Sequence, residues 1–230
     1  TAGLASVTVA GIDGYHPGGG GYPGSAFEIM RNIVLQAGRI DPQQTGLLEV
    51  VRRRQAGSGV LIRPNDSWQY LAGERPAGNW LDPAYEAEGW RTGTAGFGYG
   101  DQDDETVLSD MRNNYTTVYI RKTFEVPNPG AIGRLALRIR YDDGFVAYLN
   151  GREVARSGVQ RGRRGRVTRV EIHEAVASYE TFVIRNADRV LRKGNNVLSI
   201  TGYNHRPESS DFTLDPYLVD LDKAKDLDLP

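Results

Sequence analysis

An acidic run is the part of this sequence best suited to hold a cation. Asp101-Gln102-Asp103-Asp104-Glu105 follows the glycine-rich turn Phe97–Gly100. Four carboxylates in five residues repel one another unless a cation or basic side chains neutralise them, and calcium prefers oxygen ligands on flexible loops. The run therefore predicts a calcium site, although its spacing is not that of an EF-hand. The expected ligands are Asp101, Asp103 and Glu105. The alternative is a solvated acidic loop that pairs with Arg112 or Arg121.

A second candidate site is the segment Tyr141-Asp142-Asp143-Gly144. A carboxylate next to an aromatic ring suits sugar recognition, because sugar hydroxyls bond to the carboxylate while the apolar sugar face packs on the ring. We therefore predict that Tyr141, Asp142 and Asp143 bind a ligand. The alternative is that the two aspartates cap the turn by accepting hydrogen bonds from backbone amides.

The polar segment Tyr203–Asp211 is the third candidate, because it is rich in hydrogen-bonding groups and contains one of only three histidines. We expect it to form the rim of a ligand site. The predicted contacts are Tyr203, Asn204, His205 and Arg206. A catalytic histidine needs a nucleophile and an orienting group. Ser209, Ser210 and Asp211 are too close to His205 in sequence to be interpreted as a triad, so we predict no catalytic residue and no enzyme activity.

Two further features complete the set of candidates. Trp80, in the loop Ala77–Asp82, is the tryptophan that we expect to be exposed, as a platform for sugar stacking. Gln160–Arg169 carries five arginines and is expected to be a mobile basic loop that grips acidic polysaccharide, phosphate groups or an acidic protein surface. A merely solvated loop is the alternative. The acidic tail Asp220–Asp228 also allows head-to-tail pairing between copies through opposite charges.

The elements that must position these residues are mostly β-strands. Leu135, Leu137 and Ile139 alternate with more polar residues, which is the period of a half-buried strand. A second strand follows at Phe145–Leu149, and Asn150-Gly151 is a strong signal for a hairpin turn. The remaining expected strands are Val60–Arg63, Ser67–Ala72, Thr94–Gly98, Thr117–Val126, Arg152–Ser157, Thr181–Ile184, Asn196–Tyr203 and Phe212–Val219. Short strands separated by turn signals predict a β-sandwich.

The first 59 residues differ from the rest. Tyr15–Gly24 is dominated by glycine and proline and is expected to be a connector. Ser25–Gly38 is predicted to be a helix, because Ser25 and Glu28 form a capping box. A second short helix is expected from Asp41 to Arg54. We therefore predict a helical N-terminal extension at 1–59, a sandwich at 60–222 and an acidic tail at 223–230. The extension is too small for a core of its own and should pack on the sandwich or on another chain.

Composition excludes several classes of function. The 230 residues carry a formal net charge of −1, so nothing overall recruits nucleic acid. The absence of cysteine excludes thiol catalysis, thiolate metal sites and disulfides. No apolar run approaches the roughly 18–20 residues of a membrane-spanning helix, so we expect no membrane insertion. The chain begins with Thr1 rather than Met, which indicates a processed chain or a part of a longer protein.

From Leu61 to Asp220 the order of motifs resembles the galactose-binding-like domains of large exported bacterial proteins. The motifs are Trp68-Gln69-Tyr70, Trp90, Gly96–Asp101, Thr117–Phe124, Arg140–Gly151, Gly194–Leu198 and Tyr203–Leu214. The resemblance implies an all-β jelly-roll sandwich and export to the periplasm, cell surface or medium. It also implies a non-catalytic binding module for carbohydrate or a glycan-bearing surface, often with a structural calcium. The alternative is a structural or assembly subunit that binds other protein chains through its sandwich and its N-terminal extension.

Overall fold

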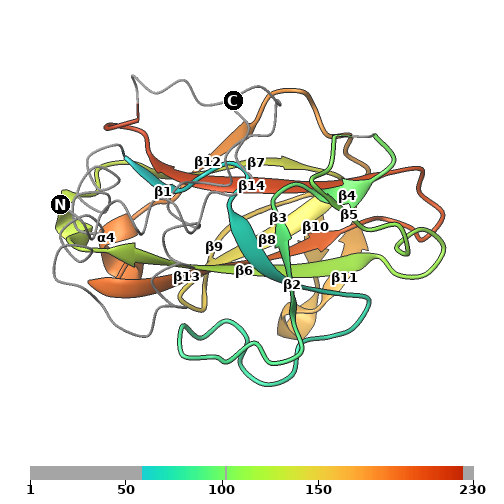
Figure 1. Ribbon diagram of the computed structural model, residues 1–230, viewed down its shortest axis with the longest axis horizontal. Helices are drawn as coiled ribbons and strands as arrows, with labels where there is room; N and C mark the ends of the chain where they lie inside the picture. The colour runs from blue at the N-terminus through green and yellow to red at the C-terminus, as the bar shows by residue number, and fades with distance from the viewer. Residues whose placement is uncertain (1–58, 102, 225–230) are drawn as a thin grey trace, which may run out of the picture. The chain divides into compact units, whose positions relative to one another are not determined.

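A computed structural model of the chain describes residues 59–101 and 103–224, and it is built almost entirely of β-strands (Figure 1). The all-β prediction is therefore confirmed. The predicted helices at Ser25–Gly38 and after Asp41 lie outside the described residues, as does most of the N-terminal extension and the end of the acidic tail. None of the described helices is long and apolar enough to cross a bilayer.

Two six-stranded sheets form the domain, one above the other in Figure 1. We call them sheet A and sheet B. Sheet A has the order β12 (Glu180–Val183), β7 (Leu135–Tyr141), β14 (Phe212–Asp220), β4 (Phe97–Tyr99) and β5 (Thr106–Val107), and β1 (Val60–Ile62) also pairs with β14. Sheet B has the order β3 (Arg91–Thr94), β2 (Ser67–Ala72), β6 (Thr117–Val126), β13 (Gly194–Tyr203), β8 (Gly144–Leu149) and β9 (Arg152–Ser157). All neighbouring strands are antiparallel except β4 and β5.

The core lies between the two sheets, because each long strand turns alternate side chains inward. Leu135, Leu137 and Ile139 of β7 are fully buried, as are Leu198 and Ile200 of β13. All of these belong to one apolar cluster that joins both sheets. The outward side chains of β7 include Arg138 and Arg140, which the same alternation places on the opposite face of sheet A. That outer face carries one of the candidate sites.

The predicted hairpin turn at Asn150-Gly151 is confirmed. Both residues have positive φ, at 50° and 84°, which only a few residue types adopt without strain. Asn150 also donates from Nδ2 to Oδ1 of Asn196, which is fully buried. Asn196 in turn binds the backbone of Arg192 and Gly194 at 2.8 Å. The turn and the start of β13 are thus joined by a closed set of amide hydrogen bonds.

Two of the predicted elements differ in the structure. The strand expected at Thr94–Gly98 is two strands in different sheets, because the chain bends at Ala95-Gly96. Here Ala95 donates its amide to the Asp66 carbonyl, while Gly96 accepts from the amide of Thr106. The expected loop at 160–169 is instead a hairpin of β10 (Val159–Arg161) and β11 (Val167–Val170), closed by a short 3-10 turn η2 (Arg163–Gly165). A single helical turn, α4 (Ala187–Val190), follows β12, and η1 (Pro129–Ala131) is a second 3-10 turn.

Candidate functional site

The loop after β7 and the loop between β13 and β14 meet at one end of the sandwich, and Asp143 joins them. Its Oδ2 accepts hydrogen bonds from the backbone amide and the Nδ1 of His205, both at 2.7 Å. Its Oδ1 accepts from the backbone amide of His173 at 3.0 Å. Asp143 is only 1 % exposed. Its contacts are those of a carboxylate that holds three loops together, which favours the turn-capping alternative for this residue.

Tyr141 is also occupied by the protein itself. Its ring stacks on His173, with the centroids 4.3 Å apart, and meets the edge of Phe145. Its hydroxyl donates to Oγ of Ser157 at 2.8 Å. Because the side chain is 1 % exposed, no ring face is open for a sugar. The structure thus places Tyr141 in the core behind the loop end.

The other residues predicted in the late loop divide into buried and exposed ones. Asn204 is buried and donates to the Asp211 carbonyl at 2.9 Å, while its Oδ1 accepts from the amide of Arg206. Tyr203 is partly exposed, and burial and the neighbouring tyrosines raise its pKa to about 12. Arg206 is exposed and His205 is half-buried. Of the four predicted residues, Tyr203, His205 and Arg206 are therefore the ones that a ligand can reach at least in part.

Three carboxylates gather beside this loop end. Oxygen atoms of Asp142, Glu174 and Asp211 lie within 4.8 Å of one another. Asp142 is 3 % exposed. Burial raises its pKa to about 8, with further increases from Asp143, Asp211 and Glu174. Calcium binds oxygens at about 2.3–2.6 Å, so ligands around one ion lie up to roughly 5 Å apart. The cluster fits a divalent cation, and we call it the acidic triad.

The three residues predicted as calcium ligands face different groups of the protein. Burial and the charges of Asp211, a member of the triad, and of Asp103 raise the pKa of Asp101. Asp103 instead pairs with Arg140 at 3.1 Å, and Glu105 lines a pocket next to that pair. The alternative that gave Arg121 as the partner of the acidic run is wrong. Arg121 instead donates hydrogen bonds to the carbonyls of Asp82 and Tyr85, and these bonds tie their loop to sheet B.

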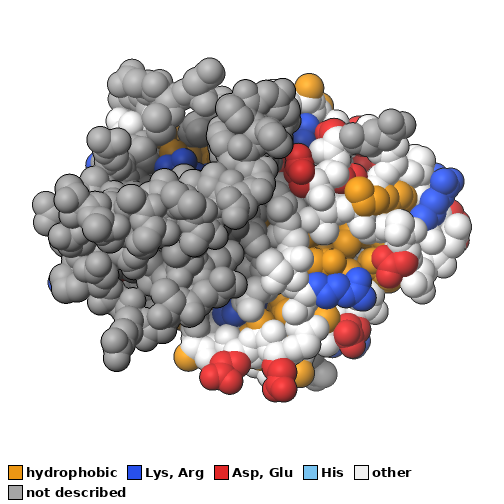
Figure 2. Space-filling view, in the orientation of Figure 1, with side chains coloured by type: hydrophobic (Ala, Val, Ile, Leu, Met, Phe, Trp, Pro, Cys, Tyr) orange, Lys and Arg blue, Asp and Glu red, His pale blue; other side chains and the backbone are white. Residues whose placement is uncertain are grey.

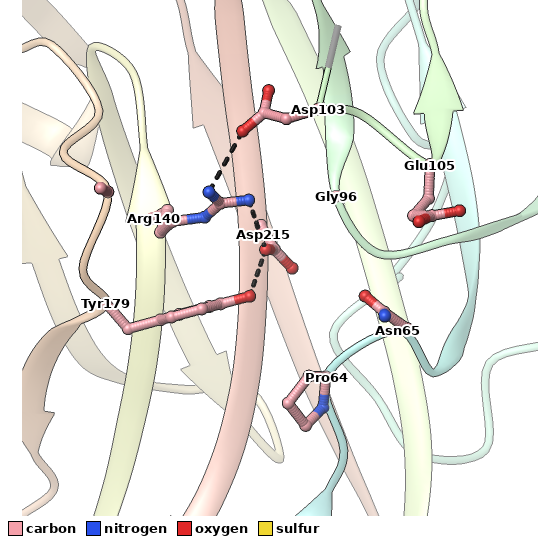
Figure 3. Close-up of a pocket in the computed structure, with 9 residues that line it drawn as sticks. Pro64, Asn65, Gly96, Asp103, Glu105, Arg140, Tyr179 and Asp215 are labelled. Carbon is pink, nitrogen blue, oxygen red and sulfur yellow. Dashed lines mark hydrogen bonds and ion pairs between the residues drawn. The ribbon is translucent and has the colours of Figure 1, made fainter. Parts of the chain in front are cut away.

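This pocket is the second candidate site, and it lies on the outer face of sheet A (Figure 3). It has a volume of about 270 Å³. We call it the Arg140 pocket, and its lining residues are Pro64, Asn65, Gly96, Asp103, Glu105, Arg140, Ala177, Tyr179 and Asp215. Arg140 and Asp215 lie opposite each other on β7 and β14. The pairing of these two strands therefore creates the charged wall of the pocket.

Asp215 is the centre of that wall. Its Oδ2 accepts from Nη2 of Arg140 at 3.2 Å and from the hydroxyl of Tyr179. Its Oδ1 is buried and has no hydrogen-bond partner among residues 59–101 and 103–224. Figure 3 shows this second oxygen turned away from Arg140, toward the space beside Asn65. Burial raises the pKa of Asp215, and the bonds from Tyr179 and Arg140 only partly oppose this.

Tyr179 completes the wall with an aromatic ring. The guanidinium carbon of Arg140 lies 5.4 Å from the ring centroid of Tyr179. Burial and the charge of Asp215 raise the pKa of the Tyr179 hydroxyl, so it remains a donor at neutral pH.

Nearby, burial together with Asp103 and Asp101 raises the pKa of Asp104 to about 7. The pocket therefore offers a guanidinium, carboxylates, an amide and an aromatic ring within one small volume.

Trp80 lies apart from both sites, in an aromatic cluster. Its ring packs against Trp90 at 5.8 Å, against Tyr119 at 5.4 Å and against Tyr148 at 6.4 Å. Trp80 is half-buried, so its exposure is partial. It fastens its loop onto the outer face of sheet B and leaves one part of the ring at the surface.

Comparisons with known proteins leave the family open. No protein-family model and no curated protein matches this chain. Solved structures that resemble it include a β-glucuronidase from glycoside hydrolase family 2 (18% identity, TM-score 0.41, 65% of this chain and 14% of that one). A second is the Bifidobacterium dentium β-glucuronidase complexed with coumarin-3-O-glucuronide, with 22% identity and a TM-score of 0.41 over 63% of this chain and 20% of that one. A third is a β-glycosidase from Bacteroides vulgatus, with 14% identity and a TM-score of 0.42 over 70% of this chain and 20% of that one.

The present chain spans a fifth or less of the length of these proteins. At such identities and TM-scores, the likeness identifies neither the family nor an activity. The function must be argued from the site itself.

Proposed function

We propose that this chain is a non-catalytic, exported carbohydrate-binding domain that takes a sugar into the Arg140 pocket. The observation that carries this is the second carboxylate oxygen of Asp215, which is buried at the pocket wall without a partner in the described part of the chain. A buried acceptor without a donor costs free energy. A sugar hydroxyl would supply that donor after a small shift of the side chains that cover this oxygen, and it also accepts hydrogen bonds from guanidinium and amide groups.

The rest of the pocket agrees with this ligand. Arg140 and Asn65 offer donors, Asp103 and Glu105 offer acceptors, and Tyr179 offers an aromatic ring for the apolar side of a sugar. The volume of about 270 Å³ is small for a ligand site, which suits one sugar unit of a chain.

The absence of catalysis is part of the proposal. The two histidines in the described part of the chain already have partners in the fold: His205 binds Asp143, and His173 contacts Glu180 at 3.0 Å. Neither contact presents a nucleophile beside a histidine base, which histidine-assisted acyl transfer would need.

We also assign a structural calcium ion to the acidic triad rather than to Asp101, Asp103 and Glu105 together. Asp142 is buried among like charges, and a divalent cation would remove that repulsion. Such an ion would fix the loop end next to the acidic run without taking part in sugar binding.

The test of the sugar site is a matched pair of variants. Asn65→Gly removes a pocket side chain while keeping a residue that tolerates the positive φ of 59°. Asn113→Gly makes the same change at φ 64°, at a residue that does not line the pocket. We expect a glycan array to identify a sugar ligand. Calorimetry should then show that Asn65→Gly binds this sugar roughly three- to tenfold more weakly, because one or two hydrogen bonds are lost. Asn113→Gly should bind it with unchanged affinity.

Failure of the folded wild-type protein to bind any glycan on the array would overturn the proposal. If the same protein formed concentration-dependent oligomers, the assembly role would replace it. Equal weakening in both variants would place the sugar outside the Arg140 pocket.

A further inference from the structure

Positive charge is concentrated in one part of the domain, strands β9 to β11. Residues 152–171 contain seven arginines and two glutamates, a net charge of +5 in a chain whose total is −1. On the face shown in Figure 2, acidic and basic side chains of the described residues are interspersed. We call residues 152–171 the basic hairpin segment.

Most of these charges face solvent. Arg152, Arg163, Arg166 and Arg169 are exposed, and within the described part of the chain none of them has an acidic partner. Because these arginines have no carboxylate partners among the described residues, they do not stabilise the fold through ion pairs there. Their exposed guanidinium groups are therefore available to an external anion.

Two other arginines are held in place. Glu153 binds Nη1 of Arg161 at 2.7 Å and Nε of Arg156 at 3.5 Å. One carboxylate between two guanidinium groups leaves a net positive charge. The pairs also fix the start of the hairpin onto β9, so the free arginines extend from an anchored base.

An aromatic surface adjoins this base. The guanidinium of Arg161 lies 5.6 Å from the ring centroid of Tyr148, and Tyr148 pairs with Glu153 across β8 and β9. Tyr148 also contacts Trp80, the half-exposed tryptophan of the aromatic cluster. At the base of the segment, Arg161 thus lies beside two aromatic rings.

We propose that the basic hairpin segment binds an acidic polysaccharide that carries carboxylate or sulfate groups. The planar guanidinium group forms paired hydrogen bonds with such groups, and several exposed arginines in one segment match a repeating anion. A single-stranded nucleic acid fits less well, because its successive bases need stacking rings along the whole contact. Tyr148 and Trp80 adjoin the base of the segment, whereas residues 149–178 include no Phe, Tyr or Trp. This inference names a ligand class for the proposed carbohydrate function but uses a different surface from the Arg140 pocket.

The test uses a triple variant with a charge-matched control. Arg163→Gln/Arg166→Gln/Arg169→Gln removes three exposed charges from the segment. Arg75→Gln/Arg112→Gln/Arg185→Gln removes three exposed charges elsewhere. The probes are heparin for sulfate, polygalacturonate for carboxylate, neutral dextran and a single-stranded DNA oligonucleotide. Binding is measured by calorimetry at low and at physiological salt.

We expect the wild-type protein to bind heparin or polygalacturonate, but not dextran, and more weakly at higher salt. The hairpin variant should bind roughly tenfold more weakly, since each exposed pair contributes modestly. The control should stay within about twofold of wild type. Arg163→Lys/Arg166→Lys/Arg169→Lys keeps the charge without the planar fork, and we expect an intermediate affinity. Melting temperatures would confirm that all variants are folded.

Equal losses of polysaccharide affinity in the two triple variants, or tighter binding of DNA than of either polysaccharide, would overturn the inference. So would undiminished polyanion binding in the hairpin variant. Asn65→Gly separates this inference from the pocket proposal, because it should leave polyanion binding unchanged. If no array sugar binds the pocket while the hairpin variant loses polyanion binding, the pocket proposal fails and this one stands.

Discussion

Calcium binding at the acidic triad should depend steeply on pH. In the calcium-free protein the pKa of Asp142 is about 8, because the carboxyl group is buried beside Asp143, Asp211 and Glu174. At neutral pH it therefore holds a proton that calcium must displace. Each ion bound below pH 8 should release close to one proton.

The size of the effect follows from the ionised fraction. For a pKa of about 8, the ionised share of Asp142 falls from one half at pH 8 to about 1 % at pH 6. The apparent calcium affinity should fall about 50-fold over that interval, equivalent to about 2 kcal/mol of lost stabilisation. For a domain of this size, that is a difference of roughly 5 °C in the calcium-induced rise of melting temperature.

Without calcium, the stability of the protein should change with pH in the opposite direction. A carboxyl group whose pKa is higher in the folded than in the unfolded state binds an extra proton on folding, so stability is lost as pH rises from about 4 through 8. In EDTA the protein should therefore become less stable from pH 6 to pH 8. With excess calcium the trend should be weaker or reversed.

The assay is thermal unfolding at pH 6 and pH 8, in EDTA and in millimolar calcium, with calorimetry in two buffers to count released protons. Asp142→Asn should lose both the calcium response and the pH dependence in EDTA. Asp188→Asn, at an exposed site on α4, should keep both. A calcium affinity that is the same at pH 6 and pH 8, or a wild-type protein that calcium does not stabilise at either pH, would refute this reasoning.

Two further changes test the fold. Asn196→Ala removes a fully buried amide that binds Arg192, Gly194 and Asn150, and urea unfolding should show a loss of about 2–4 kcal/mol. A loss below about 0.5 kcal/mol would mean that water replaces these bonds. Phe97→Ala empties a fully buried core position and should cost about 3–5 kcal/mol. Ile172→Ala, at a side chain that is 71% exposed, should cost less than about 0.5 kcal/mol.

The strands were predictable because alternation and turn chemistry are local. The period-two pattern of Leu135–Ile139 and the Asn150-Gly151 turn locate two strands and their connection without knowledge of the rest. The hairpin of β10 and β11 was missed because its strands are short and arginine-rich, with little apolar alternation. The bend at Ala95-Gly96 was missed because long-range backbone bonds, not local preference, divide that segment between two sheets.

The candidate sites were harder to predict, because each depends on which strands become neighbours. Asp142 and Asp211 were both visible as carboxylates, but only the meeting of two loops brings them together with Glu174. Arg140 and Asp215 are 75 residues apart and face each other through the pairing of β7 and β14. A charged residue at an outward position within an apolar strand, such as Arg140, was the one available signal.

Strand β9 ends sheet B, and its arginines have a consequence for solubility. The last strand of a sheet presents backbone groups that can recruit a strand from another molecule and start aggregation. Arg152 and Arg156 are exposed on β9, so two copies that approached edge to edge would bring like charges together. Replacing both with threonine or valine would create a β-prone edge that invites such aggregation.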